Sequence, residues 1–246
     1  MESRRRVRIV SGDEATIRAA GQQGAGNSSG MSRRALLAGL PLLLAACQTK
    51  SGAIKNAGLE VTTEGAPNYA LAYAARRDGG FNIPAIPWKE FDPRYLRQSV
   101  RYMSRHEPGT VVVDPHAKFL YLIQPGGKAI RYGIGVGRAG FAWSGDATIR
   151  FKREWPKWFP PAEMIDRDPS LEKYRDGQEG GPRNPIGARG LYLWQGNVDT
   201  LYRIHGTNQP RSIGTNASSG CIRMWHQDII DLYNRVEVGA KVVVLG

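Results

Sequence analysis

A histidine and a cysteine near the C-terminal end of the 246-residue chain have the types and spacing for acyl transfer. His205 follows a predicted strand that ends at Ile204, and Cys221 follows a Gly-rich turn after the loop 206–220. A thiol attacks a carbonyl as thiolate, yet a cysteine with a pKa near ~8.5 is only a few per cent thiolate at neutral pH. A neighbouring imidazole can take the thiol proton. If the two strand ends bring them within reach, the pair predicts a cysteine nucleophile with a histidine base.

Residue type alone leaves other interpretations open. Gly220 beside Cys221 favours catalysis, because a carbonyl can approach the backbone there and backbone N–H groups can hold an oxyanion. A lone cysteine is also often a small buried hydrophobe, and a lone histidine is often structural. A zinc site using Cys221, His205 and His226 is a further alternative, although no Cys-x-x-Cys or His-x-x-x-His spacing supports it.

The elements that must position this pair are mostly short strands. Thirty Gly and fifteen Pro favour many turns over long helices. Runs typical of strands are residues 110–113, 118–123, 129–136, 191–193, 202–204 and 241–245. Helices are predicted at 227–235, around 69–77 and at 92–104. The segment 153–189 is a long insertion loop, which in a compact domain is usually a lid or a binding loop. The sum predicts a mainly β sandwich or partly closed barrel with one helix near the C-terminus.

The residues around the pair resemble the signature of a known family. The sequence IHGT at 204–207 and SSGCIRM at 218–224 resemble the His-Gly-Thr and Ser-x-Gly-Cys-Ile-Arg-Met of YkuD-type L,D-transpeptidases. Residues 109–136 resemble the family's opening strands, NPIG at 184–187 its Asn-Pro-Leu-Gly segment, and VGAKV at 238–242 its closing strand. The resemblance covers 109–246 and implies that this part is the catalytic domain.

The resemblance implies roles for individual residues. Cys221 corresponds to the nucleophile and His205 to its base. The backbone carbonyl of Gly206 would orient the imidazole, which fixes its tautomer. The oxyanion would be held by the backbone N–H of Cys221 and of Gly220 or Ser219.

Two neighbouring positions are less defined. Arg223 lies where the family carries Arg or Asn, and it either binds a substrate carboxylate or braces the loop. Ser219 departs from the His that many members carry before Gly-Cys, which puts acceptor positioning in doubt. Three tryptophans either line the groove or belong to the core: Trp155, Trp158 and Trp194.

By the same resemblance, the substrate is the tetrapeptide stem of peptidoglycan. Cys221 attacks the carbonyl of its third residue, releases D-Ala and passes the acyl group to an amine. That amine belongs to a second stem peptide, giving a 3→3 cross-link, or to an outer-membrane protein. The alternatives are a hydrolase or amidase on the same fold with water as acceptor, and a non-catalytic wall-binding lipoprotein. No metal or cofactor is implied.

The first 46 residues read as a leader. Residues 1–30 are polar and Gly- and Ser-rich, which predicts disorder or an untranslated stretch with translation starting at Met31. Residues 31–46 predict a signal peptide, with basic residues before the apolar stretch 35–46. That stretch is too short for a membrane-spanning helix, which needs about 20 residues.

The residues that follow suggest a lipid anchor. The sequence LAAC ending at Cys47 resembles the lipobox of bacterial lipoproteins, which implies a lipidated Cys47 as mature N-terminus. The alternative is a buried helix that ends in Cys. Residues 47–108 would then be a lipid-anchored tether and N-terminal extension in the periplasm. Gln48 is not the Asp that resembles an inner-membrane retention signal, which favours the outer membrane.

The charge of the chain fits an acidic polymer or an anionic envelope. Its formal net charge is +12. Because no RNA- or DNA-reading motif accompanies this excess, the sequence predicts no nucleic-acid partner.

Overall fold

The computed structural model describes residues 54–56, 59–137, 143–218 and 220–246. The chain divides into two units, Met1–Gln48 and Thr49–Gly246, and every described residue belongs to the second. The predicted leader, Cys47 and Ser219 lie outside the described residues. Within these ranges no helix is long and apolar enough to cross a membrane.

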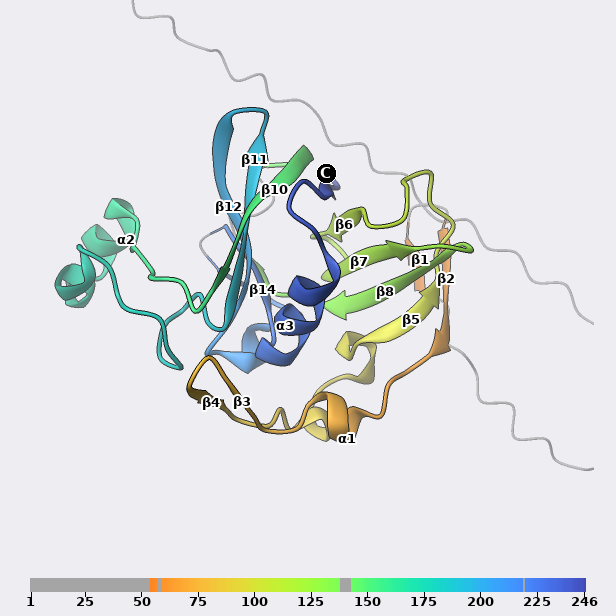
Figure 1. Cartoon of the computed structure of the whole chain (residues 1–246), viewed down its shortest axis with the longest axis horizontal. Coiled ribbons are helices and arrows are strands. Elements are labelled where there is room, and N and C mark those ends of the chain that lie inside the picture. Colours follow the sequence, from red (N-terminus) through yellow and green to blue (C-terminus); the bar gives the residue numbers. More distant parts are fainter. Residues whose placement is uncertain (1–53, 57–58, 138–142, 219) are drawn as a thin grey trace, which may run out of the picture. The chain divides into compact units, whose positions relative to one another are not determined.

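One large sheet dominates the described part of the chain (Figure 1). Its eleven described strands are, in spatial order, β1 (Ile54–Asn56), β2 (Leu59–Gly65), β5 (Gln98–Arg101), β8 (Lys128–Gly133), β7 (Phe119–Gln124), β6 (Val111–Asp114), β15 (Lys241–Val244), β10 (Gly145–Glu154), β11 (Arg189–Gln195), β12 (Val198–Gly206) and β14 (Ile222–Met224). Strand β15 pairs parallel with β6 and antiparallel with β10, so the C-terminal strand joins the two halves of the sheet.

Smaller elements complete the unit. Two short sheets pair β3 (Arg76–Asp78) with β4 (Phe81–Ile83) and β9 (Val136–Gly137) with β13 (Asn216–Ser218). The α-helices are α1 (Tyr69–Ala72), α2 (Ala162–Arg167) and α3 (His226–Arg235). The 3-10 helices are η1 (Trp88–Glu90), η2 (Pro93–Tyr95), η4 (Pro169–Tyr174) and η5 (Pro210–Ser212).

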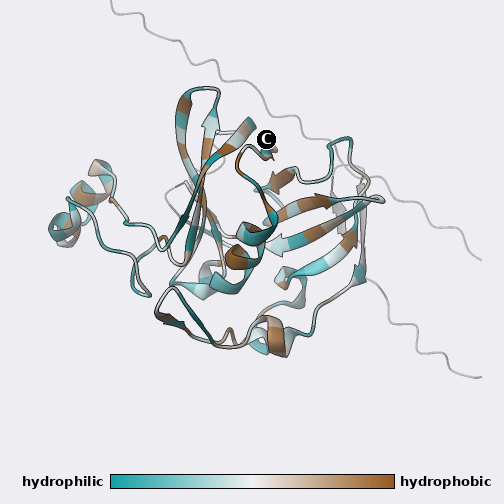
Figure 2. Ribbon diagram, viewed as in Figure 1, coloured by the Kyte–Doolittle hydropathy of each residue, from teal (hydrophilic) through white to brown (hydrophobic). Residues whose placement is uncertain are grey.

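Alternating side chains of β7 face two different apolar clusters. On β7, Leu120 and Leu122 face the main core, whereas Phe119, Tyr121 and Ile123 face a second cluster on the other side of the sheet. Successive side chains of a strand point to opposite faces, so a strand covered on both sides is apolar throughout. Figure 2 shows this apolar run along β7 and more mixed colouring along β10 to β12.

Helix α3 packs on both halves of the sheet. Ile229 and Leu232 are fully buried in the main core together with residues of β8 and β11. The hydroxyl of Tyr132 on β8 donates to Asp231 at 2.7 Å. In Figure 1 the helix lies in front of the sheet, between β12 and β8. This helix confirms the one predicted at 227–235, and the mainly β class is confirmed with it.

Two predictions about local structure were wrong. Residues 92–104 form η2 and the strand β5 instead of a helix, because Gln98 and Val100 alternate with outward residues and pair with β8. The long strand β10 was missed. Its exposed charged residues hide the alternating Ala147 and Ile149, which face the core. Strands β10 and β11 also narrow the predicted loop to residues 155–188, hereafter the insertion, which contains α2 and η4.

Candidate active site

Two parallel strands place the histidine and the cysteine on one face of the sheet. Strands β12 and β14 pair with His205 opposite Arg223 and with Ile204 opposite Ile222. Ile204 and Ile222 point into the core. Because side chains alternate, His205 and Arg223 point to the other face. Cys221 lies two residues before Arg223 and so shares that face. The two strands therefore place His205 and Cys221 on the same face of the sheet, and their roles as base and nucleophile stay predictions.

That face borders a cavity of about 870 Å³. One wall comes from the insertion and carries mainly apolar side chains. The other comes from β11, β12, β14 and the loop between His205 and Cys221, and it is more polar. The insertion contributes Lys157, Trp158, Phe159, Pro160, Pro161, Met164, Leu171, Pro185 and Ile186; the opposite wall contributes Tyr192, Thr200, Leu201, Tyr202, Arg203, His205, Asn208, Gln209, Gly220, Cys221 and Arg223.

The His205 ring is buried and held by backbone. Its Nδ1 lies 2.5 Å from the carbonyl oxygen of Gly206. A carbonyl only accepts, so Nδ1 carries the proton and Nε2 is the basic nitrogen. Burial lowers the pKa of His205 to about 4, although hydrogen bonds with the backbone of Gly206 and Ile186 oppose the shift. The imidazole is therefore a neutral base at neutral pH.

The thiol of Cys221 is in its neutral form as well. Burial raises the pKa of Cys221, while a backbone hydrogen bond from Arg203 and the charges of Arg203 and Arg223 oppose that rise. The Sγ atom also lies 3.9 Å from the carbonyl oxygen of Leu201. These shifts favour a neutral thiol at Cys221 and a neutral imidazole at His205.

Gly220, directly before Cys221, has backbone dihedral angles that other residues rarely adopt. Gly220 has a φ of +140°, although a Cβ there would meet only Tyr202, at 3.7 Å. Glycine is therefore required by conformation more than by space. The described part of the predicted oxyanion site is Gly220 and Cys221, and the role of Ser219 stays a prediction.

Two arginines border the cavity, and they are held differently. Arg203 pairs with both carboxylate oxygens of Asp199 at 2.7 Å and lies 4.4 Å from the ring of Tyr192. Arg223 donates to Gln209 at 2.9 Å, and its buried Nε has no acceptor among the described residues. Arg223 thus braces the loop through Gln209 and also faces the cavity. Sequence reasoning missed Arg203, although it lies two residues before His205 on the same strand and so shares its face.

His226, the first residue of α3, is not at the surface. Its side chain is buried, and Nδ1 accepts a hydrogen bond from the backbone N–H of Ala188 at 3.2 Å. Burial lowers its pKa to about 4. A Cβ at Gly187 would overlap the ring and would lie 3.0 Å from the carbonyl carbon of Gly206. Within the described ranges, no group of three or more His, Cys, Asp or Glu is arranged to hold a metal ion.

The three tryptophans have different places. Trp158 borders the cavity, whereas Trp155 packs on Phe81 at 4.6 Å between ring centroids and Trp194 packs on Phe151 at 5.8 Å. Of the two alternatives, Trp158 therefore follows the one in which the side chain lines the groove, whereas Trp155 and Trp194 do not border this cavity.

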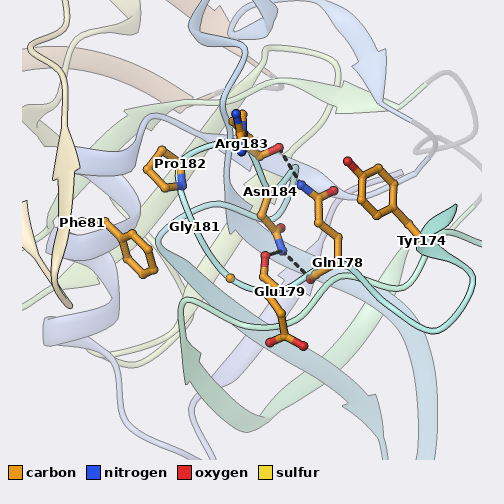
Figure 3. Close-up of a pocket in the computed structure, with 9 residues that line it drawn as sticks. Phe81, Tyr174, Gln178, Glu179, Gly181, Pro182, Arg183 and Asn184 are labelled. Carbon is orange, nitrogen blue, oxygen red and sulfur yellow. Dashed lines mark hydrogen bonds between the residues drawn. The ribbon is translucent and has the colours of Figure 1, made fainter. Parts of the chain in front are cut away.

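A second cavity of about 390 Å³ lies against the insertion (Figure 3). Phe81 and Tyr174 border it from two sides. The amide of Asn184 donates to the backbone carbonyls of Gln178 and Glu179, at 3.0 and 3.1 Å, and a third bond goes to Pro156. Asn184 thus fastens the two ends of the insertion to each other, a role that the resemblance of 184–187 did not reveal.

Comparison with known proteins points to one family. The model of the L,D-transpeptidase catalytic domain, YkuD, matches residues 108–244. The probable L,D-transpeptidase ErfK/SrfK of Escherichia coli strain K12 is 33% identical over 142 residues, which are 55% of this chain and 43% of that protein. The probable L,D-transpeptidase YbiS of the same strain is 32% identical over 148 residues, or 56% and 44%. The chain therefore spans less than half the length of these two relatives.

A solved structure from Brucella melitensis is also similar in sequence. It is described as a probable carnitine operon oxidoreductase, caia, and is 50% identical. The match covers 65% of this chain and 99% of that chain, with a TM-score of 0.45. A superposition with so low a score does not by itself establish a shared fold.

Proposed function

The chain belongs to the YkuD family of L,D-transpeptidase catalytic domains, and we propose that Cys221 is the nucleophile with which it transfers an acyl group from a peptidoglycan stem peptide to an amine. The observation that carries this proposal is the placement of His205 and Cys221 at one cavity, with the His205 ring oriented by the Gly206 carbonyl.

The first half-reaction forms a thioester. The Sγ of Cys221 bonds to the carbonyl carbon of the third stem residue while its proton passes to Nε2 of His205. The carbonyl oxygen becomes negative and is held by the backbone N–H groups of Cys221 and Gly220. When the C–N bond breaks, terminal D-Ala leaves as an amine with the proton from His205. A base that is neutral at working pH can accept this proton, and the neutral pair at rest fits such general-base attack.

The second half-reaction transfers the acyl group. An amine attacks the thioester, its proton passes to His205, and the thiol of Cys221 is restored. The cavity favours an amine over water, because the apolar wall with Trp158, Phe159 and Pro160 shelters the thioester. Positioning can contribute about 7–11 kcal/mol in effective molarity, enough to overcome the abundance of water. With water as acceptor, the same site would be a hydrolase.

A β-lactam tests the nucleophile directly. A carbapenem contains a strained cyclic amide, and its opening by Sγ would leave a covalent acyl adduct on Cys221. We expect intact-mass spectrometry to show one adduct on the wild type and none on Cys221→Ser. Slower formation is expected on His205→Ala. An adduct of equal yield on Cys221→Ser would place the reactive group elsewhere.

We further propose that the protein works in the periplasm, anchored by lipid at Cys47 and more suited to the outer than to the inner membrane. The support is the sequence pattern before Cys47 and Gln48 after it. A lipid tether would hold the site against a wall whose stem peptides bear carboxylates, and the basic chain would favour that surface.

A further inference from the structure

The insertion begins at Trp155 and ends just before Arg189, and we call these two ends its neck. The neck is bonded to the hairpin β3–β4, which precedes residues 108–244, the part that matches the family model. Asp78, at the end of β3, accepts two hydrogen bonds from Arg189, at 2.7 and 2.8 Å, and one from the indole of Trp155 at 2.8 Å. Trp155 is the first residue of the insertion, and Arg189 is the first residue after it. One carboxylate therefore binds both ends of the segment that forms the apolar wall of the cavity.

The same neck leads to the imidazole. The backbone N–H of Trp155 donates to the carbonyl of Ala188 at 2.9 Å, and Arg189 donates to that carbonyl at 2.8 Å. The N–H of Ala188 binds His226. Two residues earlier, Ile186 borders the same cavity as His205, and its backbone acts to raise the pKa of that imidazole. A shift of the neck would thus move backbone that holds the proposed base.

The packing around Asp78 leaves little freedom. Trp155 has a φ of +42°, which is a strained conformation for a bulky residue. A Cβ at Gly79 would lie 2.6 Å from the indole nitrogen, and one at Gly180 would overlap the Trp155 carbonyl. The ring of Phe81 in the hairpin packs at a tilt against that of Trp155. Phe81 also borders the second cavity beside Gly181, as Figure 3 shows. The hairpin and the insertion therefore fit together in one arrangement.

The hairpin is itself anchored to the helix that follows the nucleophile strand. The Gln227 amide on α3 donates to the carbonyls of Ala74 and Pro84, at 3.2 and 2.9 Å, on either side of the hairpin. Ile83 packs with Ala188 and Ile230 in a small apolar cluster. The hairpin that carries Asp78 is therefore held in place by α3, so Asp78 can position the neck.

We propose that Asp78 is a positioning residue, which holds both ends of the insertion and thereby sets the placement of His205 and of the apolar wall over Cys221. The inference rests on the proposed acyl transfer for its kinetic consequence. The side chain of Arg189 is only 5% exposed, and its other carboxylate partner, Glu154, lies farther away at 3.6 Å and is 57% exposed. Loss of the Asp78 charge would therefore leave the buried guanidinium poorly paired. The neck would then separate from the hairpin.

Asp78→Asn keeps the shape and removes the charge, and Trp155→Phe removes only the indole bond. We expect acylation by a carbapenem, measured per folded molecule, to slow roughly tenfold to hundredfold in Asp78→Asn, since a misplacement of about 1 Å can cost 10²-fold. Trp155→Phe should show a smaller loss in the same direction. Trypsin should cut Asp78→Asn faster within the insertion, which has exposed Arg167 and Lys173. Asp78→Glu should restore part of both properties.

The control is Glu90→Gln. Glu90 pairs with Arg211 at 2.9 Å, also between the N-terminal segment and the domain, but both side chains are more than half exposed. We expect it to match the wild type.

The pH profile of Cys221 alkylation by iodoacetamide separates positioning from stability. In Asp78→Asn its acidic limb should move upward, as the less buried His205 regains its ordinary pKa.

Three outcomes would overturn the inference. The first is wild-type acylation and trypsin resistance in Asp78→Asn, and the second is lower stability with an unchanged pH profile. The third is an equal loss in Glu90→Gln. If the wild type itself is not acylated, the proposed function fails, but alkylation and proteolysis still test the role of Asp78.

Discussion

Gly187→Ala should disturb His226 and the backbone that holds His205 more than the conformation of Gly187 alone would explain. Gly187 has a φ of +68°, and an alanine there costs about 1–2 kcal/mol in the left-handed region. Its Cβ would also overlap the His226 ring, lie 2.8 Å from Nδ1 and approach the carbonyl carbon of Gly206. Overpacking of this kind adds about 1–3 kcal/mol, for a total of roughly 2–5 kcal/mol.

The matched control is Gly126→Ala. Gly126 has a φ of +75° in the β7–β8 turn, and no atom lies within 4 Å of a Cβ built there. It should lose only the conformational part. Urea unfolding of both variants should therefore give free energies of unfolding that differ by about 1–3 kcal/mol. Because the Gly206 carbonyl holds the His205 ring, acylation should also slow in Gly187→Ala and not in Gly126→Ala. Equal losses in the two variants would refute the reasoning.

Four further outcomes are expected. His205→Ala should slow the alkylation of Cys221 at neutral pH, and an unchanged rate would mean that another base acts. In the wild type, the alkylation rate should still be rising above pH 9, because burial raises the pKa of the thiol; a plateau at lower pH would contradict that direction. Asp228 has a pKa raised by burial to about 7, so it holds a proton in the folded protein that the unfolded chain releases above about pH 4. Stability should therefore fall as the pH rises from about 4 to about 7, and thermal unfolding of Asp228→Asn should show a weaker fall; the same slope in both proteins would assign the pH dependence to other groups. Cys47→Ala should release the protein from membranes without loss of activity on soluble muropeptides, and unchanged membrane association in fractionation would reject the lipid anchor.

The parts of the site that follow local patterns could be predicted from the sequence. Strands β7 and β12 carry apolar or alternating runs that mark them as strands. His205 lies in β12 and Cys221 directly before β14, and these two strands pair with each other. The apolar side of the helix α3 is visible in the sequence at Ile229, Ile230 and Leu232. These features depend on residues that are close in sequence, so composition and spacing can predict them.

The remaining features depend on distant parts of the chain. Asp78 and Arg189 are 111 positions apart, and nothing around either residue indicates a partner. His226 stands at the start of a helix, where capping and surface residues are common, and its burial depends on Gly187 and Ala188 of the insertion and on Gly206 of β12, which are distant in sequence. Residues 92–104 were predicted as a helix, whereas pairing with β8 makes part of them a strand.

The products of purified enzyme and disaccharide-tetrapeptide test the central claim most directly. Mass spectrometry of the muropeptides should show dimers that lack one terminal D-Ala with the wild type, and none with Cys221→Ser. Such dimers require both a covalent acyl step and an amine acceptor. Tripeptides alone, with no dimer and no protein-linked product, would replace the transferase with a hydrolase, and equal dimer formation by Cys221→Ser would contradict the proposed mechanism.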